Sequence, residues 1–145
     1  MKSLKIISAL FVLAFTAGAL IAKPIPGPKG GRILTTEAPH AEFFVEKDHS
    51  AIVTFYDAAL KPVAPGDQVI NAVVEAKTGK MKIEFAKTAT GFVSKTLLPE
   101  GDDYNIVVQI RASADAKPKN FRVYYEDKLC EECKRPEYAC ICEAK

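Results

Sequence analysis

The amino-acid sequence predicts an all-β protein, a seven-stranded antiparallel sandwich of two sheets. Three observations support this prediction. Seven segments have the alternation of apolar and polar residues, or the richness in β-branched and aromatic residues, that is typical of strands. Turn residues separate these segments at short intervals, and no stretch has convincing helical periodicity. A loop containing proline and glycine and ending in a tyrosine precedes the sixth segment.

Residues 1–22 are predicted to be a signal peptide. Lys2 and Lys5 form a short positive region, an apolar run follows, and Ala17–Ala19 matches the A-x-A cleavage pattern, with Ala22 as an alternative site. The apolar run of about 17 residues is at the lower limit for a membrane span, which favours cleavage over a retained anchor. We therefore expect a periplasmic or secreted product with no stable membrane anchor after cleavage.

Residues 23–40 are predicted to be a Pro/Gly-rich tether. Lys23–Gly31 contains three prolines and three glycines, which favour neither a helix nor a strand ladder. The sandwich itself is assigned to residues 41–127, and the cysteine-rich tail, which we expect to lie outside its core, to residues 128–145.

The first three predicted strands are Ala41–Glu46, Ser50–Asp57 and Gln68–Ala76. The first is short and follows a period of two, and the second is rich in β-branched and aromatic residues. Prolines and a glycine then mark a turn. The third strand places its apolar residues on one face.

The last four predicted strands are Lys80–Phe85, Gly91–Leu98, Tyr104–Arg111 and Phe121–Glu126. Lys80–Phe85 alternates charged and apolar residues without a break, and a Thr78-Gly79 turn precedes it. The last two strands carry apolar or aromatic side chains at every second position, with a polar loop between them.

The segment Leu98–Tyr104, with the sequence LPEGDDY, resembles the corner before the sixth strand of fibronectin type III and other immunoglobulin-like domains. That resemblance implies an immunoglobulin-like sandwich in which the Tyr104 hydroxyl bonds to the backbone upstream. An ordinary loop before a strand is the alternative. Size, leader and sandwich together are similar to small exported bacterial domains of the CopC and YtkA-like groups. Their copper ligands have no counterpart here, because the mature N-terminus offers no histidine.

The sequence contains none of the common catalytic motifs, so we expect a non-enzymatic protein. His40 and His49 do not form a metalloprotease pattern, and the glycine-rich segment 27–31 precedes no helix. The leader contains two of the 20 basic residues, so the rest of the chain carries 18 basic and 18 acidic residues. Because these charges are evenly distributed, nucleic acid and anionic membranes are not expected partners.

The tail contains every cysteine of the chain, in a C-x-x-C and a C-x-C pair formed by Cys130, Cys133, Cys140 and Cys142. Four thiolates suit one thiophilic ion, Zn²⁺ or Cu(I), and Pro136 in the spacer can help reverse the chain. Two disulfides are the alternative in an oxidising compartment, and a redox pair at Cys130 and Cys133 is the third.

These features predict an exported binding protein whose tail binds a thiophilic metal ion. The alternative function is a structural or adhesion module stapled by disulfides, and the third is a thiol redox protein that uses the C-x-x-C. The expected partner is a metal ion or another exported protein. Lys128, Lys134 and Arg135 are expected to offset the negative charge of a tetrathiolate site.

Overall fold

The computed structural model describes residues 24–142, which form an all-β fold with one short 3₁₀ helix. The predicted signal peptide, residues 1–22, lies outside the described residues. The elements are β1 (Arg32–Ile33), β2 (His40–Val45), β3 (Ala51–Tyr56), β4 (Pro62–Val63), β5 (Val69–Ala76), β6 (Gly79–Lys87), β7 (Phe92–Ser94), β8 (Tyr104–Arg111), β9 (Lys119–Tyr125) and η1 (Glu137–Ala139).

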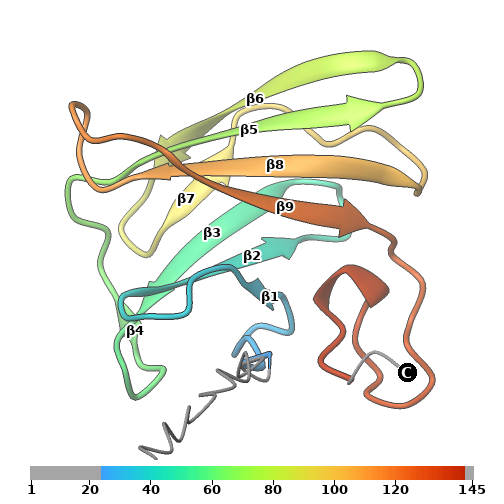
Figure 1. Ribbon diagram of the computed structural model, residues 1–145, viewed down its shortest axis with the longest axis horizontal. Helices are drawn as coiled ribbons and strands as arrows, with labels where there is room; N and C mark the ends of the chain where they lie inside the picture. The colour runs from blue at the N-terminus through green and yellow to red at the C-terminus, as the bar shows by residue number, and fades with distance from the viewer. Residues whose placement is uncertain (1–23, 143–145) are drawn as a thin grey trace, which may run out of the picture.

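The nine strands form one antiparallel sheet that curls into a half-barrel (Figure 1). The strand order is β1-β2-β3-β7-β6-β5-β8-β9, with β4 paired to β3. β6 connects the two halves of the sheet: Gly79–Glu84 pairs with β5, whereas Phe85–Lys87 pairs with β7. The sheet is therefore continuous, whereas the sequence predicted two separate sheets.

All seven predicted strands are present in the structure, and β1 and β4 are additional. Each of these two has only two residues, too few to show a periodic pattern. β7 ends at Ser94, earlier than predicted, because the chain bends at Lys95 and Thr96 and leaves the sheet there. The turn before β6 consists of Lys77 and Thr78, and Gly79, with φ of 132°, follows it.

The predicted alternation fills a single core. In β8 every second residue is buried, starting with Tyr104. In β5 buried residues likewise alternate with half-buried ones from Val69 to Glu75. Both halves of the half-barrel contribute apolar side chains to this core, among them Phe43, Val53, Val74, Ile83, Ile106 and Val123. Burial of these side chains is the main contribution to the stability of the fold.

The segment that precedes β2, within the predicted tether of residues 23–40, packs against the sheet. Gly27 and Gly31 are buried, and β1 pairs with β2. The carboxyl group of Glu42, fully buried, accepts hydrogen bonds from the Lys29 N–H at 3.0 Å and the Gly31 N–H at 2.8 Å. A side chain at Gly27 would lie 2.6 Å from the Gly31 carbonyl oxygen, so this close approach requires glycine.

The predicted tyrosine corner is confirmed by a hydrogen bond. The Tyr104 hydroxyl donates to the carbonyl of Pro99 at 3.0 Å, and the ring is 4 % exposed. Gly101 has φ of 90°, in the region that glycine adopts without strain, and this lets the loop turn into β8. The corner fixes the loop between residues 98 and 104 to the start of β8.

Replacing Tyr104 by phenylalanine is expected to lower the free energy of unfolding by about 0.5–1.5 kcal/mol, the net contribution of one hydrogen bond. Urea denaturation followed by far-ultraviolet circular dichroism measures this loss. Tyr124→Phe is the matched control, because its hydroxyl donates to Asp103 at 2.6 Å from a ring that is 49 % exposed. We expect the control to change stability by about 0.5 kcal/mol or less. Equal losses in the two variants would contradict a special role for Tyr104.

Candidate metal centre

The C-x-x-C pair lies on a tight turn after β9. An isolated bridge between Leu129 and Pro136 closes the loop. Inside it the Cys130 N–H donates to the Arg135 carbonyl at 2.8 Å, and the Lys134 N–H donates to the Cys130 carbonyl at 3.0 Å. Lys134 has φ of 57°, the left-handed conformation that lets the chain reverse directly after Cys133.

The second pair is brought back by the short helix η1. Pro136 precedes this helix, and the Cys140 N–H donates to the Glu137 carbonyl at 3.1 Å at its end. The chain therefore reverses within the spacer, at the position where the sequence predicted that Pro136 would help. Cys140 and Cys142 then lie beside the first pair.

The structure brings all four predicted ligands together. Their sulfur atoms lie within 4.8 Å of one another, and the cysteines are free rather than paired in disulfides. The separations between sulfurs are 3.7 Å for Cys130–Cys142, 3.8 Å for Cys133–Cys140 and 3.6 Å for Cys130–Cys140. A regular tetrahedron with bonds of about 2.3 Å from zinc to sulfur has edges of about 3.8 Å. The cluster is thus compatible with one tetrahedral ion at its centre.

Backbone groups make one of the thiols acidic. The pKa of Cys133 is lowered to about 6, first by hydrogen bonding from the backbone of Ile141 and then by that of Arg135. The pKa of Cys142 is raised, first by the neighbouring sulfur of Cys140 and then by that of Cys130. The sulfurs are close enough to share protons, and the Cys133 thiolate forms more readily than those of Cys140 and Cys142, whose pKa values are raised.

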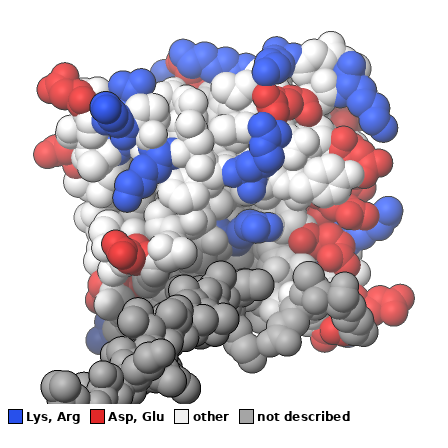
Figure 2. Space-filling model, in the orientation of Figure 1, with Lys and Arg blue, Asp and Glu red and all other residues white. Residues whose placement is uncertain are grey.

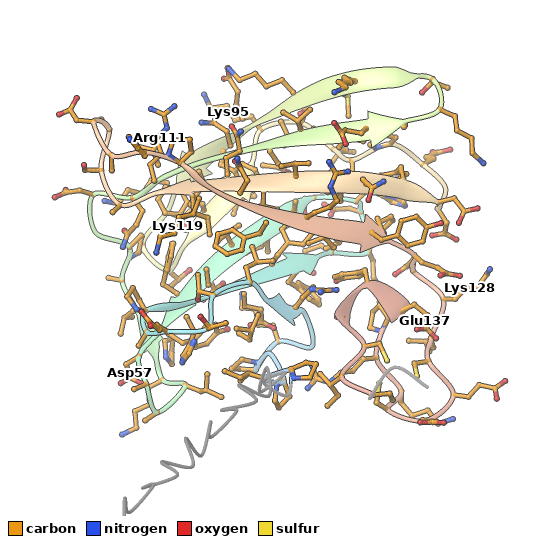
Figure 3. The ribbon with its side chains drawn as sticks, in the orientation of Figure 1. Asp57, Lys95, Arg111, Lys119, Lys128 and Glu137 are labelled. Carbon is orange, nitrogen blue, oxygen red and sulfur yellow. The ribbon has the colours of Figure 1, made fainter. Side chains whose placement is uncertain are left out.

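Two of the basic side chains that were expected to offset the charge of the cluster bond to other groups. The Lys128 ammonium pairs with Glu126 at 3.2 Å, and in Figure 3 its side chain points away from the sulfur atoms. The Arg135 guanidinium donates to the Gly27 carbonyl at 3.2 Å. Backbone N–H groups contribute directly instead, as with the Cys142 N–H, which donates to the Cys140 sulfur at 3.4 Å.

Acidic side chains gather at the end of the sheet that the tail follows. Figure 2 shows them gathered along one side of the molecule, where β8 begins and β9 ends. The loops at this end carry Asp102, Asp103, Glu126 and Asp127. A concentration of negative charge raises the local concentration of cations, which favours the arrival of a metal ion.

Tyr138 anchors the tail, residues 128–145 in the prediction, in the core of the sheet. Its ring is 2 % exposed and lies 5.3 Å from the ring of Tyr125 and 6.3 Å from that of Phe43, centroid to centroid. The Val45 N–H donates to its hydroxyl oxygen at 3.1 Å, and its own N–H donates to the Glu126 carbonyl at 3.1 Å. The tail and the sheet therefore share one core.

Two features of this region were missed in the sequence. Tyr138 is the one aromatic residue after Tyr125, and an isolated aromatic residue in a charged segment is the signal that could have indicated an anchor. The burial of Glu42 gave no such signal, because its partners come from a loop rather than from a strand.

The cysteine cluster is distinct among the possible metal ligands. Within residues 24–142 it is the one group of three or more His, Cys, Asp or Glu side chains whose ligand atoms converge. His40 contacts the Thr35 carbonyl at 3.3 Å, and His49 lies in the turn between β2 and β3. Over the same described part of the chain, no helix is long and apolar enough to cross a membrane.

Comparisons of the chain with protein-family models, with curated proteins and with solved structures find no match. The function is therefore argued from the residues of the cluster and their surroundings.

Proposed function

We propose that this is an exported, non-enzymatic binding protein whose tail binds one thiophilic metal ion. The observation that carries the proposal is the set of sulfur separations, 3.6 to 3.8 Å, among four free cysteines. Tetrahedral coordination by four thiolates is typical of Zn²⁺, and soft thiolates also bind Cu(I). Zn²⁺ is the better fit, because Cu(I) does not require all four sulfurs in a tetrahedron.

The export part of the proposal depends on the sequence of residues 1–22, which has the composition of a signal peptide.

We further propose that the half-barrel is an immunoglobulin-like sandwich. If the seven strands of three or more residues are lettered in chain order, A, B, D and E are β2, β3, β6 and β7, and C, F and G are β5, β8 and β9. Strands A, B, E and D neighbour one another in one half of the sheet, and G, F and C in the other. This order supports the proposal, because it is the order of the two immunoglobulin sheets.

Metal stoichiometry tests the proposed function directly. The reduced protein, titrated anaerobically with Zn²⁺ and separately with Cu(I), is expected to bind one equivalent of Zn²⁺ and to release protons as the thiols ionise. A Cys140→Ser/Cys142→Ser variant is expected to bind at least about 1,000-fold more weakly, because two of the four thiolates are gone.

Lys80→Ser/Lys82→Ser on the exposed face of β6 is the matched control, and it is expected to bind Zn²⁺ like the wild type. Zn²⁺ binding by the wild type no stronger than that of the cysteine variant would contradict a metal site.

The main alternative is a structural or adhesion module with a disulfide-stapled tail. The separations of Cys130 from Cys142 and of Cys133 from Cys140 support it, because these two pairs use all four sulfurs. The mass of the protein isolated without reductant distinguishes the two functions. A loss of four hydrogens relative to the reduced chain supports the disulfides, whereas a metal adduct that is lost on acidification supports the metal site.

A further inference from the structure

We propose that the ion bound by the tail is a structural clasp, which fixes the segment Gly27–Arg32 to the body of the protein. This inference rests on the proposed metal site and extends it, because it assigns the ion a resident role rather than that of a cargo. The two parts that the ion would connect are more than 100 residues apart in the sequence.

The tail and the segment contact each other through two reciprocal hydrogen bonds. The Arg135 guanidinium donates to the Gly27 carbonyl at 3.2 Å, and the Arg32 guanidinium donates to the Tyr138 carbonyl at 3.4 Å. Each part thus provides one arginine and one carbonyl. Both bonds are partly buried, and hydrogen bonds from a charged donor contribute more to stability than neutral ones do.

The position of Arg135 depends on the C-x-x-C turn. Its carbonyl accepts the Cys130 N–H, and its backbone N–H contributes to the lowered pKa of Cys133. Between Cys130 and Pro136 the side chains are exposed or only half-buried, so the turn has no apolar core of its own. A short segment of this kind needs a cross-link to keep one conformation, and an ion bound to both cysteine pairs provides it.

The segment has one further anchor on its other side. The Glu42 carboxyl group binds the Lys29 and Gly31 N–H groups, and a bridge joins Pro26 to Arg32. The Glu42 bonds connect the segment to β2, and the bridge closes the segment on itself. When the C-x-x-C turn loses its ion, the Arg135 bond is lost with it, and on the tail side the Arg32 bond to the Tyr138 carbonyl remains.

A hollow of about 280 Å³ lies along this junction and shows that the two parts are not packed together by apolar contacts alone. Its walls come from Pro24, Ile25 and residues 32–36 on one side and from Ala139, Cys140 and Ile141 on the other. Because few atoms pack across this hollow, the two arginine bonds and the order of the tail contribute to how firmly the tail and the segment are joined.

Hydrogen exchange followed by mass spectrometry tests the clasp on the reduced full chain, with Zn²⁺ or with a chelator. We expect Zn²⁺ to slow amide exchange in residues 27–32 about tenfold or more, because an ion that binds the ordered tail stabilises whatever the tail orders. The β5–β6 hairpin, which lies far from the tail in Figure 1, is the internal reference and is expected to exchange equally in both conditions.

Arg135→Ala separates the clasp from the metal site. This variant retains all four cysteines and is expected to bind one equivalent of Zn²⁺, yet Zn²⁺ should no longer slow exchange in residues 27–32. Arg122→Ala is the matched control, because Arg122 lies on β9 and pairs with Glu75 on the surface. In Arg122→Ala, Zn²⁺ is expected to slow amide exchange in residues 27–32 as much as in the wild type.

The outcomes distinguish the two proposals. Two results would overturn the clasp and leave the metal site intact. In the first, the wild type binds one equivalent of Zn²⁺ but amide exchange in residues 27–32 does not slow. In the second, Zn²⁺ slows this exchange as strongly in Arg135→Ala as in the wild type. Failure of the wild type to bind Zn²⁺ would overturn the proposed function and the clasp together.

Discussion

Replacing Tyr138 by alanine is expected to lower the free energy of unfolding by about 3–5 kcal/mol, the range for truncating a buried aromatic side chain. The ring fills the space between Phe43 and Tyr125, and its hydroxyl accepts the Val45 N–H. Alanine leaves a cavity and an N–H group without its partner, and both effects destabilise the folded state. Urea denaturation of the metal-free, reduced protein measures the loss without a contribution from the ion.

Two variants control this prediction. Tyr138→Phe removes only the hydroxyl and is expected to cost about 0.5–1.5 kcal/mol. Tyr124→Ala removes a ring of the same size from an exposed position on β9 and is expected to cost about 1 kcal/mol or less. A loss below about 1 kcal/mol for Tyr138→Ala would show that the tail does not belong to the core.

Replacing Glu42 by alanine is the second change with a large expected effect, about 2–4 kcal/mol of lost stability. The Glu42 carboxyl group accepts a hydrogen bond from the Tyr56 hydroxyl at 2.7 Å, in addition to those from the Lys29 and Gly31 N–H groups. The pKa of Tyr56 is raised, first by burial and then by this bond, which keeps its hydroxyl a donor. Without Glu42 these donors are left without partners in a region that excludes water.

Glu42→Gln keeps the size of the side chain and one acceptor oxygen, so we expect a loss of about 1–2 kcal/mol. Glu37→Ala, an exposed acidic residue in the loop before β2, is the control and is expected to change stability by about 0.5 kcal/mol or less. Thermal unfolding followed by circular dichroism ranks the three variants. Similar losses for Glu42→Ala and Glu37→Ala would contradict a role for burial.

The strands could be predicted from the sequence because each long strand carries its own signal. Lys80–Phe85 alternates over its whole length, and β6 contains all of it. The Tyr104 corner was also predictable, since loop and tyrosine are adjacent in the sequence. A local pattern of this kind needs no knowledge of distant residues.

The cysteine cluster was predictable for the same reason, because all its ligands fall within one short segment. The position of that segment against the sheet could not be predicted from the sequence. Tyr138 reaches Phe43 and Val45 across more than 90 residues, and no local periodicity records such a contact. The burial of Glu42 is similar, because alternation in β2 indicates which face a residue occupies but not that a glycine-rich loop covers it.

The contact between the tail and the segment Gly27–Arg32 also determines the order in which the fold is completed during biosynthesis. The segment leaves the ribosome before its partner Arg135, which follows it 108 positions later in the sequence. Contacts with so large a sequence separation form late, because the chain entropy of closing the loop has to be overcome first. We therefore expect the tail and the segment to join after the strands have paired, and metal binding at the proposed site to accompany that late step.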